Sequence, residues 1–170
     1  MKNVYLIGMM GSGKTTSGRA LAKLLAVSFV DLDDRIVEEA GHSINDIFKT
    51  EGEPYFRGVE TKLLTRLSKL ENQVVATGGG VVLDSSNREH MRNTGLVIYL
   101  KTSLDVLWER VKEKKDRPLL KSSDPKESLK DLFYKRTPLY ESSSDKFFLT
   151  DHKLPEAVGL EIYKTCFEKK

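Results

Sequence analysis

The stretch GMMGSGKTT, from Gly8 to Thr16, decides the fold of this chain. Residues 8–15 match the pattern G-x-x-x-x-G-K-[ST], in which a glycine-rich turn joins a strand to a helix and holds phosphate groups. Glycines lack a Cβ atom, so successive backbone N–H groups can turn toward an anion. The flanking sequence fits this pattern, because the apolar run NVYLIG leads into the turn and an amphipathic helix follows it. The stretch therefore predicts a site for a nucleoside triphosphate.

The side chains of this loop each have an expected contact. Lys14 is expected to reach the β- and γ-phosphates, and Thr15 to offer its hydroxyl to Mg²⁺, which prefers oxygen ligands. The start of the helix adds backbone donors and the positive end of the helix dipole. The residues of the loop that we expect to bind the phosphates are Gly11, Ser12, Gly13, Lys14, Thr15 and Thr16.

Length and composition narrow the class of protein. The chain has 170 residues, which is enough for one compact domain with a substantial core. Hydrophobic residues make up 39% and charged residues 31%, as in ordinary globular proteins, and a net charge of +3 is too small to indicate nucleic acid. The single cysteine, Cys166, excludes an internal disulfide and a cysteine-rich metal site. No apolar run is long enough to span a membrane and no signal peptide is recognisable, so we expect a cytoplasmic protein.

Five short apolar runs predict the strands of a sheet. They are NVYLIG, SFVDLD, QVVAT, LVIYL and KFFLT, of which the last four end at Asp33, Thr77, Leu100 and Thr150. Such nearly continuous apolar runs are typical of strands that are covered on both faces. Stretches of helical period separate them, for example TTSGRALAKLLA, VETKLLTRLSKL and SLDVLWERVKEK. This alternation predicts a three-layer α/β domain with a parallel sheet.

Two stretches interrupt the alternation of strands and helices. Residues 34–70 are helix-like throughout, and KEKKDRPLLKSSDPKES, residues 112–128, is polar and charged with two prolines. The second stretch has the composition of a surface segment and is expected to bury little apolar area. It fits a plain solvated loop as well as a functional one.

The residues alone leave the phosphate acceptor open among water, a nucleotide, a small metabolite, and no acceptor at all in a regulatory switch. The guanine-reading segment N-K-x-D does not occur in the sequence. Asp31 and Asp33 are expected at the carboxyl edge of the sheet, where such folds bind ligands. One carboxylate suits Mg²⁺, and the other can accept a proton from an acceptor hydroxyl. A D-x-D pair fits helix capping equally well.

The segment TGGG, residues 77–80, and three arginines form a candidate anion site. Consecutive glycines at the end of a strand let backbone amides approach a ligand closely, although they also fit a flexible turn. Arg57, Arg117 and Arg136 are each as readily surface residues. A guanidinium, however, is the side-chain group best shaped to bind a carboxylate through two parallel bonds.

Taken in order, these segments resemble shikimate kinases, which are relatives of the nucleoside monophosphate kinases. The resemblance covers nearly the whole chain and is carried by LIGMMGSGKTTSGRALAKLL, FVDLD, SINDIFKTEGEPYFRGVE, ATGGGVV, RPLL and RTPLYE. It implies a P-loop kinase fold in a single domain over residues 1–170, with a five-stranded parallel sheet in the order 2-3-1-4-5 flanked by helices. It also implies an enzyme that uses ATP and Mg²⁺ to phosphorylate the 3-hydroxyl of shikimate, a step of chorismate and aromatic amino acid biosynthesis.

The resemblance further assigns regions and partners. Residues 34–60 become the shikimate-binding region, and residues 112–126 become a lid that brings Arg117 over the phosphates. The implied partners are ATP and shikimate, with no nucleic acid and no membrane, and the protein is expected to be a monomer. The alternatives are a kinase for another small hydroxy acid such as gluconate, and a nucleotide-binding homologue without catalytic activity.

Site residues follow from the same resemblance by matching position. Asp33 is implied to contact the shikimate hydroxyls and accept the proton, and Glu60 to orient Arg57. Asp31 is implied to support Mg²⁺ beside Thr15. The implied catalytic residues are Lys14, Asp33 and Arg117; the implied shikimate-binding residues are Asp33, Arg57, Gly78, Gly79, Gly80 and Arg136; the implied adenine-binding residues are Arg110, Lys153 and Pro155.

Overall fold

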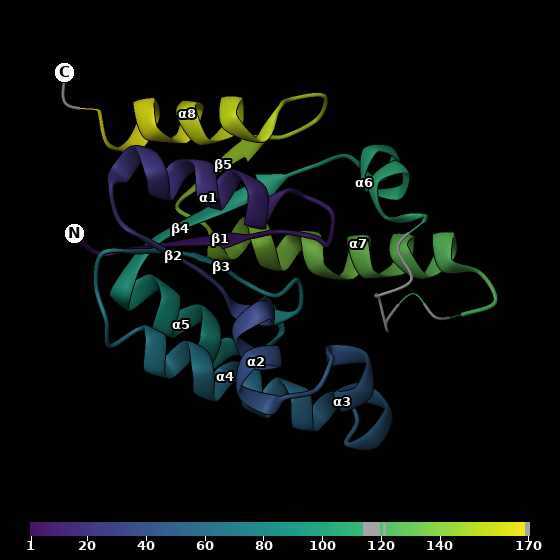
Figure 1. Ribbon diagram of the computed structural model, residues 1–170. Coiled ribbons are helices and arrows are strands. Elements are labelled where there is room, and N and C mark those ends of the chain that lie inside the picture. Colours follow the sequence, from purple (N-terminus) through teal and green to yellow (C-terminus); the bar gives the residue numbers. More distant parts are fainter. Residues whose placement is uncertain (114–119, 121, 169–170) are drawn as a thin grey trace.

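A five-stranded parallel sheet forms the centre of the protein, seen in a computed structural model that describes residues 1–113, 120 and 122–168 (Figure 1). The strands lie in the order β2-β3-β1-β4-β5, so the predicted strand order and the parallel sheet are confirmed. Their bounds are β1 Asn3–Ile7, β2 Ser28–Asp31, β3 Gln73–Ala76, β4 Gly95–Lys101 and β5 Lys146–Leu149.

Helices connect successive strands and enclose the sheet. In Figure 1, α2, α3 and α6 lie toward the side where the strands end, and the two chain termini lie at the opposite side. In the part of the chain that is described, no helix has the length and apolar composition needed to cross a membrane. The helices are α1 Lys14–Leu25, α2 Leu32–Ala40, α3 Ile44–Thr50, α4 Glu53–Leu67, α5 Ser85–Thr94, α6 Leu104–Val111, α7 Pro125–Ser143 and α8 Pro155–Cys166, with a short 3₁₀ turn at Val81–Leu83.

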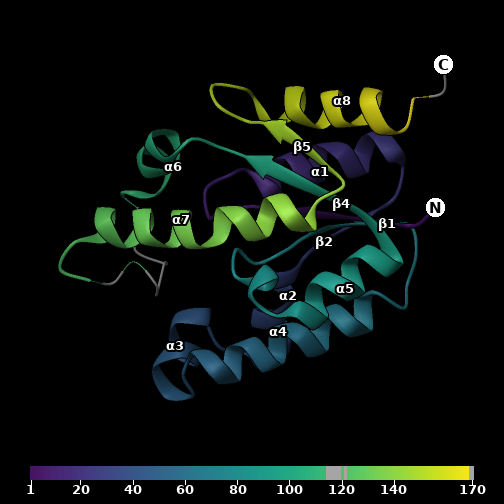
Figure 2. The same ribbon diagram turned by 180° about the vertical axis from the view of Figure 1, so that it is seen from behind.

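The strand side chains alternate between two hydrophobic clusters. Tyr5 and Ile7 of β1 pack on the face that α4, α5 and α7 cover, whereas Val4 and Leu6 pack on the face that α1 and α8 cover (Figures 1 and 2). All four side chains are fully buried. Since both faces of the sheet are covered, its strands read as apolar runs rather than as an alternating pattern.

The second strand ends earlier than the sequence predicts. The prediction placed its end at Asp33, but β2 ends at Asp31 and Asp33 lies in the first turn of α2. The carboxylate of Asp31 accepts hydrogen bonds from the backbone N–H groups of Asp33, at 3.0 Å, and Asp34, at 3.3 Å. Asp31 thus caps α2, because the first N–H groups of a helix lack partners within the helix.

The polar stretch at residues 112–128 also differs from its prediction. Its last residues are helical, since α7 begins at Pro125, a position that a proline readily takes. Leu120 is only 7% exposed and belongs to the cluster beneath the sheet, so the expectation of little buried apolar area is wrong at that residue. Residues 114–119 and 121 lie outside the described residues, and with them Arg117 and most of the predicted lid.

Candidate active site

The phosphate-binding loop lies between the end of β1 and the start of α1. Gly11 and Gly13 have φ angles of 81° and 90°, a region that side chains with a Cβ rarely adopt. These two glycines turn the chain sharply enough to bring it into α1 at Lys14. The N-terminus of α1 therefore opens directly onto the loop, where its backbone donors and its dipole favour an anion.

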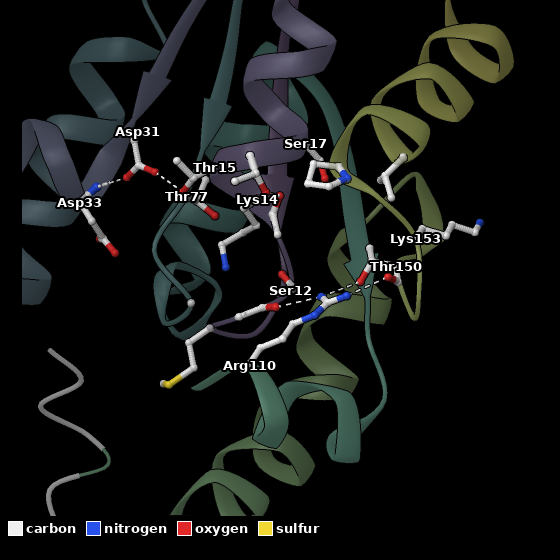
Figure 3. Close-up of a pocket in the computed structure, with 17 residues that line it drawn as sticks. Ser12, Lys14, Thr15, Ser17, Asp31, Asp33, Thr77, Arg110, Thr150 and Lys153 are labelled. Atoms are coloured by element: carbon white, nitrogen blue, oxygen red, sulfur yellow. Dashed lines mark hydrogen bonds between the residues drawn. The ribbon is translucent and has the colours of Figure 1, made fainter. Parts of the chain in front are cut away.

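Lys14 curls back over the loop that precedes it. Its Nζ atom donates to the carbonyl oxygens of Gly8, at 2.8 Å, and Met9, at 2.9 Å, and the residue is only 9% exposed. These bonds hold the ammonium group at the mouth of the loop, with the two carboxylate residues to one side and Arg110 to the other (Figure 3). A cation in this place attracts phosphate oxygens.

Thr15 and Asp31 form a pair of oxygen donors beside the loop. The hydroxyl of Thr15 donates to Oδ2 of Asp31 at 2.6 Å (Figure 3). A hydroxyl and a carboxylate suit Mg²⁺, which takes one or two protein oxygens and completes its shell with water and phosphate. The pair therefore fits the metal expected from the sequence. Elsewhere among the described residues, no group of three His, Cys, Asp or Glu side chains is placed to hold a metal ion.

A cavity of about 440 Å³ joins the loop to the candidate nucleotide and acceptor residues. The sequence predicted the loop, both aspartates, Gly79, Arg110, Lys153 and Pro155 as site residues, and all of them line this one cavity. Figure 3 shows the aspartates at one end, Arg110, Thr150 and Lys153 at the other, and Lys14 between them. The full lining is Met10, Gly11, Ser12, Gly13, Lys14, Thr15, Thr16, Ser17, Asp31, Asp33, Thr77, Gly79, Arg110, Thr150, Lys153, Pro155 and Val158.

Arg110 ties the phosphate loop to the segment after β5. Its guanidinium donates to the carbonyl oxygen of Gly11 at 3.0 Å and to that of Thr150 at 2.9 Å. Lys153 forms an exposed ion pair with Glu161 at 2.6 Å, and Pro155 opens α8. The three residues implied for adenine thus surround one end of the cavity.

The glycines after β3 leave room for charged side chains rather than for side chains of their own. A Cβ atom on Gly78 would lie 2.4 Å from Oε1 of Glu60 and 3.0 Å from Oδ1 of Asp33. A Cβ atom on Gly80 would lie 2.3 Å from Nη2 of Arg57. The side chains of α2 and α4 therefore pack directly against the backbone of this turn.

Arg136 of α7 reaches the same turn from the other side. Its Nη1 atom lies 3.5 Å from the position that a Cβ atom on Gly79 would take. Arg136 is only 2% exposed, forms no ion pair with any described residue, and has an Nε atom without a hydrogen-bond partner among them. A buried guanidinium in this state is suited to an anionic ligand.

Arg57 is held by two carboxylates of its own helix. Its Nη1 atom donates to Glu60 at 2.8 Å and its Nη2 atom to Glu53 at 3.1 Å. Burial raises the pKa of Glu60, an effect that the charge of Arg57 opposes. Burial lowers the pKa of Arg57, but Glu60 and Glu53 raise it further than burial lowers it, so the guanidinium stays charged.

The charges around the glycine turn favour a bound anion. Two guanidinium groups, those of Arg57 and Arg136, face it, while Glu60 is the one fully buried carboxylate paired with them. Glu53 is 41% exposed, so water screens its charge. The sequence predicted both arginines and the orienting role of Glu60, and the structure places all three together.

Two lining residues were not singled out from the sequence. Thr77 follows β3 and donates from its hydroxyl to the carbonyl oxygen of Leu6 at 2.9 Å. Thr150 follows β5 and accepts from Arg110, while its hydroxyl lies 2.6 Å from that of Thr102. Their position was a usable signal, because ligands of open parallel sheets bind beyond the carboxyl ends of the strands.

Comparison with known proteins agrees with this geometry. A family model described as shikimate kinase matches residues 10–167. The chain is 42% identical over 160 residues to a shikimate kinase of Xylella fastidiosa strain M12, covering 94% of this chain and 89% of that protein. It is 47% identical over 142 residues to a shikimate kinase of Nitrosospira multiformis, covering 84% of this chain and 73% of that protein.

A solved structure extends the likeness to the fold. The structure of shikimate kinase from Acinetobacter baumannii in complex with shikimate superposes with a TM-score of 0.95 at 38% identity, over 97% of this chain and 92% of that one. The match therefore spans the phosphate loop, the glycine turn and the helices that carry the arginines. The chain belongs to the shikimate kinase family.

Proposed function

We propose that this chain transfers the γ-phosphoryl group of ATP to the 3-hydroxyl of shikimate, giving shikimate 3-phosphate and ADP. The observation that carries the proposal is the pair of guanidinium groups against the glycine turn, next to Asp33 and to a cavity that begins at the phosphate loop. Shikimate has one carboxylate and three hydroxyls, so it needs a cationic clasp and a carboxylate that accepts hydroxyl protons. The site offers both within one cavity and its wall.

At the phosphate end, the loop and Lys14 are proposed to bind the β- and γ-phosphates. The backbone N–H groups of residues 11–16 and the ammonium group of Lys14 would stabilise negative charge on the transferring group. Thr15 and Asp31 would hold Mg²⁺, which when bound neutralises charge on the phosphates and helps to align them. The 2.6 Å contact between these two side chains supports a shared role.

At the acceptor end, Arg57 and Arg136 are proposed to bind the shikimate carboxylate, with Gly78, Gly79 and Gly80 lining the approach. Asp33 would orient the 3-hydroxyl and accept its proton as the oxygen attacks the γ-phosphorus. The first turn of α2 supports this role, because it holds Asp33 in the cavity that also contains Lys14.

At the nucleotide end, Arg110, Lys153 and Pro155 are proposed to line the adenine site. The bonds from Arg110 to the carbonyl oxygens of Gly11 and Thr150 would keep that wall in a fixed position beside the loop. The remaining roles rest on the sequence: one domain over residues 1–170, shikimate binding by residues 34–60, and a lid at residues 112–126 from which Arg117 contacts the phosphates. We further propose that the protein works as a monomer in the cytoplasm, where ATP is available.

Acceptor choice separates this function from its alternatives. Purified protein is given ATP and Mg²⁺ with shikimate, gluconate, AMP or no acceptor, and the release of ADP is followed. We expect turnover with shikimate alone above the slow background without an acceptor. Turnover with gluconate and none with shikimate would support the other hydroxy acid kinase, and ATP binding without turnover on any acceptor would support a non-catalytic homologue.

A further inference from the structure

Tyr140 is a buried phenol that has no part in the proposed chemistry. It lies on α7, one helical turn after Arg136, and is 0% exposed. Its ring stacks on that of Tyr99 from β4, with the ring centroids 5.2 Å apart. Burial raises the pKa of Tyr140, so the phenol keeps its proton. A buried tyrosine hydroxyl needs a hydrogen-bond partner, and the identity of that partner shows what the residue holds in place.

The hydroxyl of Tyr140 connects α7 to two loops of the site. It donates to the carbonyl oxygen of Gly79 at 2.5 Å and lies 3.6 Å from Sδ of Met9. Gly79 belongs to the glycine turn after β3, and Met9 belongs to the phosphate loop after β1. One phenol therefore contacts both the acceptor side and the nucleotide side of the cavity.

The placement of Arg136 depends on the same contact. Its guanidinium lies against Gly79, the residue whose carbonyl oxygen accepts from Tyr140. Pro138 lies between Arg136 and Tyr140 within α7, and a proline has no N–H to donate to the preceding turn. The helix is thus weakened beside Arg136. A bond from Tyr140 to the glycine turn compensates by tethering this part of α7 to the turn.

We propose that Tyr140 is a positioning residue for the phosphate acceptor: its bond to Gly79 fixes Arg136 against the glycine turn, in the place where the guanidinium receives the acceptor carboxylate. The inference rests on the proposed binding of that carboxylate by Arg136. Tyr140 acts through Arg136 and Gly79, and it is not itself among the residues that line the cavity.

The test removes only the hydroxyl, with the variant Tyr140→Phe. We expect the KM for shikimate to rise about five- to thirtyfold, since a buried carbonyl oxygen loses its donor and α7 loses its tether. The KM for ATP should stay within about twofold, because the nucleotide contacts are unchanged. The matched control is Tyr99→Phe, which removes the hydroxyl from the other ring of the stack. It should leave the KM for shikimate near that of the parent even where its melting temperature falls as far.

A coupling experiment and a binding experiment complete the test. In an Arg136→Lys background, Tyr140→Phe should raise the KM for shikimate much less than it does alone, because the two changes remove the same contact. Calorimetric titration of shikimate into ADP-loaded Tyr140→Phe gives the same comparison for a less stable variant, since bound nucleotide stabilises the folded chain.

Three results would overturn the positioning role. They are a shikimate KM for Tyr140→Phe that stays within about twofold of the parent, an equal rise in both tyrosine variants, and an equal effect of Tyr140→Phe in the two backgrounds. The parent protein is assayed alongside. Absence of shikimate turnover in the parent would refute the proposed function itself, and is thereby distinguished from failure of the tether.

Discussion

Gly80→Ala changes the acceptor site without touching the nucleotide site. The φ angle of Gly80 is −96°, which alanine adopts without strain, so the backbone can stay as it is. The added Cβ atom, however, would lie 2.3 to 2.4 Å from three atoms of the Arg57 guanidinium. That group is the far end of a flexible side chain and must move by about 1 Å to restore an ordinary contact distance.

The size of the effect follows from the bonds that this shift disturbs. Arg57 donates to Glu60 at 2.8 Å, and in the proposed complex it also donates to the shikimate carboxylate. Loss of one charge-assisted hydrogen bond costs about 1.5–3 kcal/mol, which is roughly a ten- to hundredfold rise in the KM for shikimate. The KM for ATP should change by less than about twofold, since Arg57 and Gly80 are not among the residues that line the phosphate loop cavity.

A neighbouring glycine supplies the control for this prediction. Gly58 lies beside Arg57 in α4, and a Cβ atom there would meet nothing within 4 Å. Gly58→Ala should raise the melting temperature slightly, as alanine favours a helix over glycine, and leave both KM values unchanged. Steady-state kinetics over a range of shikimate and ATP concentrations measure both variants. A folded Gly80→Ala protein that binds shikimate as the parent does would refute the placement of Arg57 in the acceptor site.

Three further predictions test individual side chains. Asp33→Asn should lower kcat by about 10²–10⁴-fold with little change in ATP affinity, because an amide cannot accept the hydroxyl proton, whereas Asp34→Asn, an exposed carboxylate next to it, should be nearly silent; comparable turnover in both variants would refute the role of Asp33. Lys14→Ala should lower kcat by about a hundredfold or more at saturating shikimate, with Lys23→Ala at the other end of α1 as the control, and single-turnover rates equal to the parent would contradict it. Arg57→Lys should raise the KM for shikimate roughly tenfold or more because an ammonium group cannot form two parallel bonds to a carboxylate, and a loss confined to ATP affinity would show that this arginine is misplaced.

The sheet and the phosphate loop could be predicted from sequence because both leave local signals. Strands buried on both faces are continuous apolar runs, and the loop needs glycine at fixed positions. The end of β2 could not be located in this way. The run SFVDLD continues with Leu32, which is fully buried, yet Asp31 caps α2 and turns the chain one residue earlier. An aspartate at a strand end and an aspartate at a helix cap look alike in sequence.

The helix α7 left too little apolar periodicity to be recognised. Its buried side chains include Leu129, Arg136, Tyr140 and Ser143, so polar residues occupy positions that a hydrophobic pattern assigns to the surface. Pro138 within it also argues against a helix. Arg136 was recognised by resemblance, but its burial and its contact with Gly79 depend on α7 packing across the chain onto the glycine turn, which no local signal records.

The most direct test of the account is the location of the transferred phosphate. Shikimate, ATP and Mg²⁺ are incubated with the protein, and the product is examined by phosphorus–proton correlation NMR. The account predicts a single new phosphate ester coupled to the proton on carbon 3 of shikimate, in an amount equal to the ADP formed. Release of inorganic phosphate in place of an ester, or an ester on a different hydroxyl, would contradict the proposed alignment of the 3-hydroxyl by Asp33, Arg57 and Arg136.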